Sequence, residues 1–408
     1  MSDISRQLEQ LVSISDQRVK IEQYKNTLAK YLDEADAGAL KTFVEHVAGE
    51  SVPLSVSRVV LLDLAHRLSS NSLSPDVVKE IGLFAIDKTA ARATSFEEAV
   101  STIRESIATI YEQEEEWSKA ARMLAAIPLE SGIRMLDDDF KVEKYIRIAM
   151  LYLQDEESVN AEQCINKASL LIGEKTDPAL MLQHKVCYAR ILDAKRRFQE
   201  AATRFYQLST LPTRTFGTKT VSEEDLTTSL QMAVTCAILA PAGPQRSRLL
   251  GTLYKDERAP RLPNFGVLEK MFMDRILRQD EVEAFAATLA DHQKARLEDN
   301  STVLDRAVIE HNMLAISRLY DNISFQQLAE LLGIDPAKAE RIASAMLIEK
   351  RLVGSIDQVD ELIRFDTSSG PAALAAFDVQ IEHVCRSVEA IASAIVKQHP
   401  NLTATQPA

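Results

Sequence analysis

The chain has 408 residues, more than one typical domain, of which 46% are hydrophobic and 26% are charged. Only 12 glycines and 13 prolines interrupt its helix-forming runs. Its formal net charge of −13 disfavours nonspecific binding to nucleic acid or anionic membranes. No run approaches the roughly 18 apolar residues of a membrane span, and the first residues lack a signal-peptide core, so we expect neither membrane insertion nor secretion.

Residues 4–93 form four or five predicted helical segments, including 56–68 and 75–88. A repeat of about 40 residues follows them. In the first helix of each copy, an alanine stands three residues before a larger side chain. The second helix of each copy carries a further alanine. They read Ile107-Ala108-x-x-Tyr111 with Trp117, Ala120 and Leu124; Ile148-Ala149-x-x-Tyr152 with Ser158, Ala161 and Ile165; and Ala189-x-x-Leu192 with Phe198, Ala201 and Phe205. Small alanines let paired helices approach closely, so the pattern predicts a tetratricopeptide-like helical solenoid.

Polar loops at residues 211–221 and 241–244 interrupt the array. Two zones near them are locally basic. They are Lys195-Arg196-Arg197, and Arg246, Arg248, Lys255, Arg258 and Arg261. Because acidic residues are interleaved, we interpret both zones as solvated helix faces, with contact to an acidic protein partner as the alternative.

The sequence pattern of residues 301–365 differs from that of the repeats. It predicts a helix, then a helix-turn-helix, then a hairpin. An amphipathic run over 303–320 precedes a helix capped by Ser324 and ended by Gly333. Asp335-Pro336 starts a third helix. Two short runs with a period of two, 352–356 and 361–365, then flank a polar turn. This order predicts a winged helix.

The charge of this unit separates DNA binding from protein binding. Between residues 301 and 365, seven Lys or Arg face ten Asp or Glu, whereas a groove-reading helix needs cations to neutralise phosphates. We therefore favour a protein-binding winged helix, whose hairpin offers an edge strand to another chain. The candidate subunit-binding residues of the hairpin are Leu352, Val353, Ile356, Ile363 and Phe365.

The last helix carries apolar residues at alternating spacings of three and four, which are heptad a and d positions. We call this set the seam: Leu374, Phe377, Ile381, Val384, Val388, Ile391 and Ile395. Such a narrow stripe predicts a bundle with helices of other chains. The alternative is docking on the chain's own winged helix.

Motifs for catalysis and cofactor binding are missing from the sequence. There is no G-x-G, no glycine directly before a lysine, no G-x-S-x-G, no H-x-H or H-E-x-x-H and no C-x-x-C. We therefore predict no catalytic residue, no cofactor, no metal site and no enzymatic activity. His311 is interpreted as a packed structural histidine, and the four cysteines as reduced, buried thiols.

A helical-repeat array followed by a winged helix and a terminal helix resembles the PCI proteins. The stretch Leu304-Asp305-Arg306-Ala307-Val308-Ile309-Glu310-His311-Asn312 is similar to one signalosome member of that family. A paralogue in the proteasome lid shares something like the Glu310-His311-Asn312 core. Stretches elsewhere, such as Ile127-Pro128-Leu129-Glu130 and Tyr254-Lys255-Asp256-Glu257-Arg258, favour the signalosome branch.

The resemblance implies a noncatalytic scaffold, in which winged helices pair edge to edge and terminal helices gather into a bundle. It implies as partners other PCI subunits, the metalloprotease-containing pair of the signalosome and a cullin-RING ligase received by the amino-terminal arm. It further implies that the complex removes a ubiquitin-like modifier from cullins and that it is found in the cytoplasm and nucleus. The alternatives are a proteasome lid subunit and a nucleic-acid-binding winged-helix factor.

The predicted fold class is an all-α solenoid followed by a winged-helix PCI module and a C-terminal amphipathic helix. The predicted domains are residues 1–295, the solenoid; 296–365, the winged helix; and 366–408, the linker and bundle helix.

Overall fold

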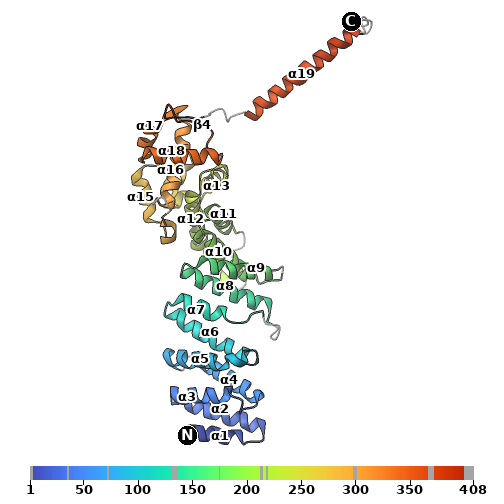
Figure 1. The fold of residues 1–408 in the computed structure, drawn as a ribbon, viewed down its shortest axis with the longest axis vertical. Coiled ribbons are helices and arrows are strands. Elements are labelled where there is room, and N and C mark those ends of the chain that lie inside the picture. The colour runs from blue at the N-terminus through green and yellow to red at the C-terminus, as the bar shows by residue number, and fades with distance from the viewer. Residues whose placement is uncertain are drawn as a thin grey trace. The chain divides into compact units, whose positions relative to one another are not determined.

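The computed structural model describes residues 3–34, 36–70, 73–130, 136–173, 175–211, 215–216, 219–296, 301–365 and 372–398. The chain divides into two compact units, Met1–Cys236 and Ala237–Ala408. The elements, shown in Figure 1, are α1 (Asp3–Val12), α2 (Gln17–Asp33), α3 (Ala37–Ala48), α4 (Leu54–Ser69), α5 (Pro75–Thr89), η1 (Ala90–Ser95), α6 (Glu97–Gln113), α7 (Trp117–Ala125), α8 (Asp138–Gln154), α9 (Ser158–Leu171), α10 (Pro178–Ala194), α11 (Phe198–Ser209), β1 (Thr215–Phe216), β2 (Lys219–Thr220), α12 (Glu223–Leu239), α13 (Pro244–Tyr254), η2 (Ala259–Arg261), α14 (Phe265–Phe272), α15 (Gln279–Ala287), η3 (Asp291–Lys294), α16 (Val303–Ser317), β3 (Asn322–Ser324), α17 (Phe325–Leu332), α18 (Pro336–Ile348), β4 (Gly354–Asp357), β5 (Leu362–Phe365) and α19 (Ala372–Gln398).

The first unit is a stack of helices, each packed on neighbours in the chain. Helix α2 contacts α4, α3 contacts α5, α4 contacts α6 and α8 contacts α10, in addition to contacts between consecutive helices. Figure 1 shows α1 to α11 following one another in chain order. Contacts to the next helix and to the one after it define a solenoid, so the predicted helical-repeat architecture is confirmed.

The predicted repeat is visible in the backbone as one turn used three times. Glu115, Glu156 and Arg196 each adopt a φ of 60° just after a helix. In each copy the N–H of the next residue donates a hydrogen bond of 2.9 Å to a carbonyl oxygen across the turn. The bonds run from Glu116 to Tyr111, from Glu157 to Tyr152 and from Arg197 to Leu192. This pattern is a Schellman motif, which satisfies a free carbonyl at the helix end and reverses the chain into the next helix.

Small alanines lie where the paired helices meet. Ala120, Ala161 and Ala201 are completely buried, and Leu124, Ile165 and Phe205 fill the neighbouring positions. Ion pairs also connect successive repeats, for example Arg147 of the second copy to Glu112 of the first at 2.9 Å. Because partly exposed pairs contribute only about 0–1 kcal/mol each, the apolar faces dominate the stability of the stack.

The basic zone at residues 195–197 is an ion-paired surface, where Lys195 contacts Glu162 and Arg197 contacts Glu200. Arg246, by contrast, is buried, so its interpretation as part of a solvated face was wrong. Its guanidinium donates to the carbonyl oxygens of Ala237 and Ile238, at 3.2 and 3.3 Å.

These two carbonyls belong to the last turn of α12, the negative end of a helix dipole. Burial lowers the pKa of Arg246 to about 10, so the side chain stays charged near neutral pH. A buried cation therefore caps α12. No local pattern indicates this role, because the arginine lies on the following helix.

Residues 211–221, expected as a polar loop, contain the short antiparallel pair β1 and β2. Of this segment, residues 212–214 and 217–218 lie outside the described part. The second predicted break is confirmed at Pro244, which occupies the first turn of α13.

The second unit contains the predicted winged helix, in the order α16, β3, α17, α18, β4, β5. Its sheet has the antiparallel order β3-β5-β4. Strand β3 was not anticipated, because three residues are too few for a period-two pattern and their pairing is with β5, about 40 residues later.

The predicted helix boundaries of the winged helix are confirmed. The Ser324 hydroxyl accepts from the N–H of Gln327, and the Asp335 carboxylate accepts from that of Ala337. Gly333 has a φ of +66°, the left-handed conformation that ends a helix. Local capping chemistry therefore sets where α17 and α18 begin and where α17 ends.

The cysteines are free thiols. Cys187 and Cys236 are buried as expected, and burial raises the pKa of Cys187 to about 12. Cys164 is half-buried, while Cys385 on α19 is exposed, so the expectation of burial was wrong for Cys385.

Candidate subunit-binding surfaces

Strand β4 is an edge of the winged-helix sheet, because β5 lies between β3 and β4. It pairs with β5 on one side only, in a register that runs from Gly354 opposite Phe365 to Asp357 opposite Leu362. An edge strand presents main-chain N–H and C=O groups that another strand can pair with. The geometry for strand addition is thus present in the hairpin.

The hairpin side chains singled out from the sequence divide into two groups. Leu352, Ile363 and Phe365 are buried in the winged-helix core, and Ile356 packs against that core. Val353 is 52% exposed. Four of the five therefore hold the hairpin on α16, α17 and α18. A partner at this edge meets the β4 backbone and Val353, and the role of these residues in subunit binding stays a prediction.

Two further apolar side chains near the hairpin were missed by pattern. Ile348 ends α18 with 77% exposure, and Val359 at the hairpin turn is 92% exposed. Ile348 continues the helical pattern of its segment, and Val359 lies in a polar turn. The sequence pattern therefore does not single out either residue.

The approach of β4 to β5 depends on a glycine. A Cβ placed on Gly354 would overlap the carbonyl oxygen of Arg364, a backbone atom that cannot move aside cheaply. Gly354 is thus required by close backbone contact at the start of β4.

The seam lies on α19. Ile381, Val384, Val388, Ile391 and Ile395 are between 47% and 61% exposed. The backbone at Leu374 and Phe377 is helical, and their side chains lie outside the described part. The five described seam residues thus form an exposed apolar stripe, of the kind that marks an interaction surface. Its role in a bundle stays a prediction.

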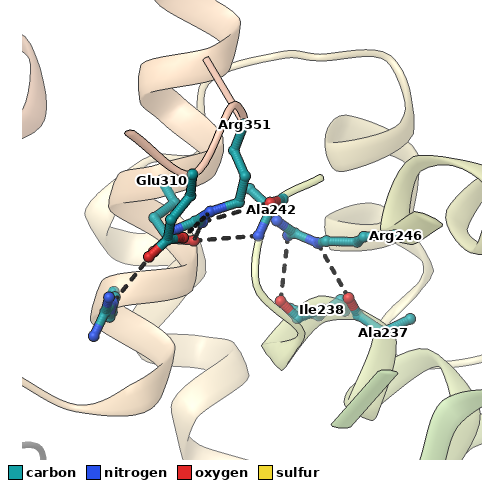
Figure 2. Close-up of polar contacts among 8 residues, drawn as sticks. Ala237, Ile238, Ala242, Arg246, Glu310 and Arg351 are labelled. Carbon is teal, nitrogen blue, oxygen red and sulfur yellow. Dashed lines mark hydrogen bonds and ion pairs between the residues drawn. The ribbon is translucent and has the colours of Figure 1, made fainter. Parts of the chain in front are cut away.

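Glu310 on α16 is the centre of a buried polar cluster (Figure 2). Its carboxylate is only 2% exposed. Arg351 binds both oxygens, and the Ala242 N–H donates to Oε2 at 3.2 Å. Arg306, one turn earlier on α16, donates from Nε to Oε1 at 3.2 Å. The cluster ties α16 to the residue before the hairpin and to the loop between α12 and α13.

The next two residues of α16 bind a second segment. His311 Nε2 lies 2.9 Å from the carbonyl oxygen of Arg275, and since a carbonyl only accepts, Nε2 carries the proton. Asn312 accepts from the N–H of Leu277 at 2.9 Å and donates to its carbonyl at 3.2 Å. We call Glu310, His311 and Asn312 the clamp. It fastens the winged helix to residues 242 and 275–277.

Local structure positions Arg351 for the clamp. Lys350 has a φ of 57°, and the Arg351 N–H donates to Met346 O at 2.8 Å, which closes α18 with the same Schellman turn as the repeats. The Glu349 carboxylate accepts from Arg351 Nε at 2.6 Å. Burial alone would lower the pKa of Arg351, but Glu310 and Glu349 raise it overall, so the group remains a cation.

No group of three or more His, Cys, Asp or Glu side chains suitable for a metal ion occurs among the described residues. In the same part of the chain, no helix is both long and apolar enough to cross a membrane.

Comparison with known proteins covers both ends of this architecture. A family model described as PSMD12/CSN4, N-terminal, matches residues 3–214, and a PCI domain model matches residues 289–367. Proteins named COP9 signalosome complex subunit 4 are similar over nearly the whole chain. The one from Arabidopsis thaliana is 48% identical, covering 95% of this chain and 96% of its own; that from Dictyostelium discoideum is 44% identical, covering 97% and 98%. The Drosophila melanogaster protein is 42% identical, covering 95% and 92%. The chain therefore belongs to the COP9 signalosome complex subunit 4 family, within the PCI-domain proteins.

Proposed function

We propose that this chain is a noncatalytic scaffold subunit of a signalosome that removes a ubiquitin-like modifier from cullin-RING ubiquitin ligases. The observation that carries the proposal is similarity at 42–48% identity, over nearly the full length, to proteins named as subunit 4 of that complex. The catalytic zinc chemistry then belongs to another subunit, in the metalloprotease-containing pair.

Two surfaces support assembly with other PCI subunits. The β4 edge has main-chain groups available to a neighbouring winged helix, and the exposed seam of α19 fits a bundle of helices from several chains. The amino-terminal repeats serve, in this proposal, as the arm that receives the cullin-RING ligase. The complex is proposed to act in both the cytoplasm and the nucleus.

Two alternatives have less support. A proteasome lid scaffold would share the family model for residues 3–214, but the near-full-length relatives described above carry the signalosome name. A nucleic-acid-binding factor would need a basic third helix, whereas in α18 Lys338 and Arg341 are accompanied by Glu340, and Glu349 follows directly.

The test is affinity purification of the tagged full chain from cell lysate, with partners identified by mass spectrometry. Beside it run a truncation ending at Phe365 and the double variant Val384→Glu plus Val388→Glu. The truncation removes the seam, and the double variant would bury two carboxylates in it, which is unfavourable. Either change should therefore deplete the recovered signalosome subunits and cullins severalfold. Because these side chains are exposed, the repeats should stay folded.

The matched control is Ala390→Glu plus Ser393→Glu, which adds the same charge about half a helical turn away from the seam. It should retain all partners. Normal assembly of the Val384 and Val388 variant would show that the seam does not form the bundle. Recovery of proteasome lid subunits would favour the first alternative, and salt-sensitive binding of duplex DNA without stable protein partners would favour the second.

A further inference from the structure

A pocket between α9, α10 and α11 has a composition unlike the rest of this acidic chain. Its volume is about 460 Å³, and it lies wholly within the first unit. Its charged lining residues are Lys185 on α10 and Arg204 on α11, and no Asp or Glu occurs among the described residues of the lining. In a chain of net charge −13, a pocket whose described lining carries only basic and neutral groups is a local reversal of sign.

The two cations have no acidic partner within the part of the chain that the structure describes. The neighbouring basic residues Lys195 and Arg197 pair with Glu162 and Glu200. Among the described residues, neither Lys185 nor Arg204 takes part in an ion pair. The guanidinium of Arg204 instead lies over the ring of Tyr188, 5.7 Å from its centroid. A cation held on an aromatic face keeps its donors available to an anion.

An ordered aromatic stack forms one wall. The rings of His184 and Tyr188 are nearly parallel, at 7°, with centroids 6.3 Å apart. Ser169 gives its proton to the Ile165 carbonyl at 2.8 Å, so His184 Nε2 donates to the Ser169 oxygen, also at 2.8 Å.

Burial, reinforced by Lys185, lowers the pKa of His184, so this imidazole is neutral near pH 7. The positive charge of the pocket thus comes from Lys185 and Arg204.

The remaining lining fits a peptide. Leu208 and Leu211 provide apolar contact, and Asn166 and Gln207 provide amide donors and acceptors for a main chain. The cavity is large enough for only two or three side chains. A nucleic-acid strand would instead need a continuous track of Lys and Arg along its phosphates.

We propose that the pocket between α9, α10 and α11 binds an acidic peptide segment of a partner protein. One apolar or aromatic side chain of the segment packs against Tyr188 and the leucines, while adjacent carboxylates or phosphates pair with Lys185 and Arg204. This site is separate from the β4 edge and the seam, so it does not depend on the chain's place in an assembly.

The test uses the full chain and fluorescein-labelled pentapeptides in which Leu, Phe or Tyr is flanked on each side by two Glu. Matched peptides carry Gln in place of Glu, and a further set carries phosphoserine. We expect the Glu or phosphoserine peptides to bind at least about tenfold more tightly than the Gln peptides, since charge-assisted hydrogen bonds are the strong ones. Stronger binding of one of the two anionic sets identifies the natural anion.

The variants Arg204→Gln and Lys185→Gln should each weaken binding about tenfold. Arg190→Gln is the matched control, because Arg190 is an exposed residue of α10 outside the pocket and the change in charge is the same. It should alter binding less than about twofold. Hydrogen exchange should show protection by the peptide in residues 178–209. Circular dichroism checks that each variant is folded.

Several outcomes overturn the proposal. Equal affinity for Glu and Gln peptides, or an effect of Arg190→Gln equal to that of Arg204→Gln, would show only diffuse electrostatic attraction. Absence of binding by every peptide up to about 1 mM would show that the pocket takes no such segment. Tighter, Arg204-dependent binding of a single-stranded oligonucleotide would show that the partner is a nucleic acid.

Discussion

Glu310 is a charged residue in an almost solvent-free position, and its surroundings explain how the fold tolerates it. Desolvating a carboxylate costs several kcal/mol unless its oxygens are hydrogen-bonded to charged or main-chain donors. Glu310 has a bidentate contact from Arg351, a backbone N–H from Ala242 and a contact from Arg306. These partners differ in burial: the Arg351 side chain is 13% exposed and that of Arg306 is 48% exposed.

This difference predicts unequal effects of two similar substitutions. Arg351→Ala leaves the Glu310 carboxylate buried without its main partner and should destabilise the winged helix by about 3 kcal/mol. Arg306→Ala removes a solvent-screened contact and should cost less than about 1 kcal/mol. Native-state hydrogen exchange of residues 303–317 measures both. Equal losses would mean that the bidentate contact is not what compensates the buried charge.

His311 is neutral in the folded chain, as its predicted structural role requires. Burial first, and the nearby Arg246 charge second, lower its pKa to about 4 from the ordinary histidine value of 6.5. The unfolded chain therefore binds a proton between pH 6.5 and pH 4 that the folded chain does not. The contribution of neutral His311 to the free energy of unfolding is fully present above pH 6.5 and decreases as the pH falls toward 4.

From this shift we expect the second unit to lose about 2 kcal/mol of stability between pH 7 and pH 5 through His311 alone. The comparison is with His311→Gln, whose amide can still donate to the Arg275 carbonyl but does not titrate. Subtracting the two pH profiles removes contributions from other groups such as Asp274, whose pKa is raised by burial. Urea unfolding monitored by hydrogen exchange in residues 303–365 measures both chains. Parallel profiles would contradict the low pKa.

At the scale of elements, the same turn recurs at the ends of α6, α8, α10 and α18, with Glu, Glu, Arg and Lys in the left-handed position. Non-glycine residues there cost about 1 kcal/mol each, and the hydrogen bond across the turn together with helix packing offsets that cost. Because none of these positions is glycine, the sequence shows the helices on either side through their apolar period but not the turn itself.

The hairpin is the element with the smallest steric tolerance. Gly354→Val places a side chain against the Arg364 carbonyl and should separate β4 from β5, at a cost of about 1–3 kcal/mol. Hydrogen exchange of residues 354–365 should rise, and partners that use the β4 edge should be lost.

The control is Gly266→Ala, on helix α14, where an added Cβ meets no atom within 4 Å. It should be neutral or slightly stabilising, because alanine favours helix. An unchanged exchange rate in the Gly354→Val hairpin would contradict the close approach of the two strands.

At the scale of the whole chain, the compact units group neighbouring helices with the winged helix. The second compact unit starts at Ala237, so helices α13 to α15 belong with the winged helix. The clamp explains why, since Glu310, His311 and Asn312 bind residues 242 and 275–277. The domain boundary predicted at residue 295 stays a prediction.

The sequence by itself determined the helical repeats, the order of the three helices and the hairpin in the winged helix, and the heptad pattern of the last helix. These follow from local periodicity and capping, as at Ser324, Gly333 and Asp335, where the signal lies within one turn of its effect. Family similarity to a signalosome subunit was likewise readable from short stretches distributed along the chain.

Only the tertiary structure decided which residues meet across long separations. Arg351 finds Glu310 from 41 residues away, Arg246 caps the helix before its own, and Lys185, Tyr188 and Arg204 converge from two helices on one pocket. It also placed Leu352, Ile363 and Phe365 in the core of the winged helix. The physical reason is that burial and pairing of a side chain depend on packing between elements, which no local period records.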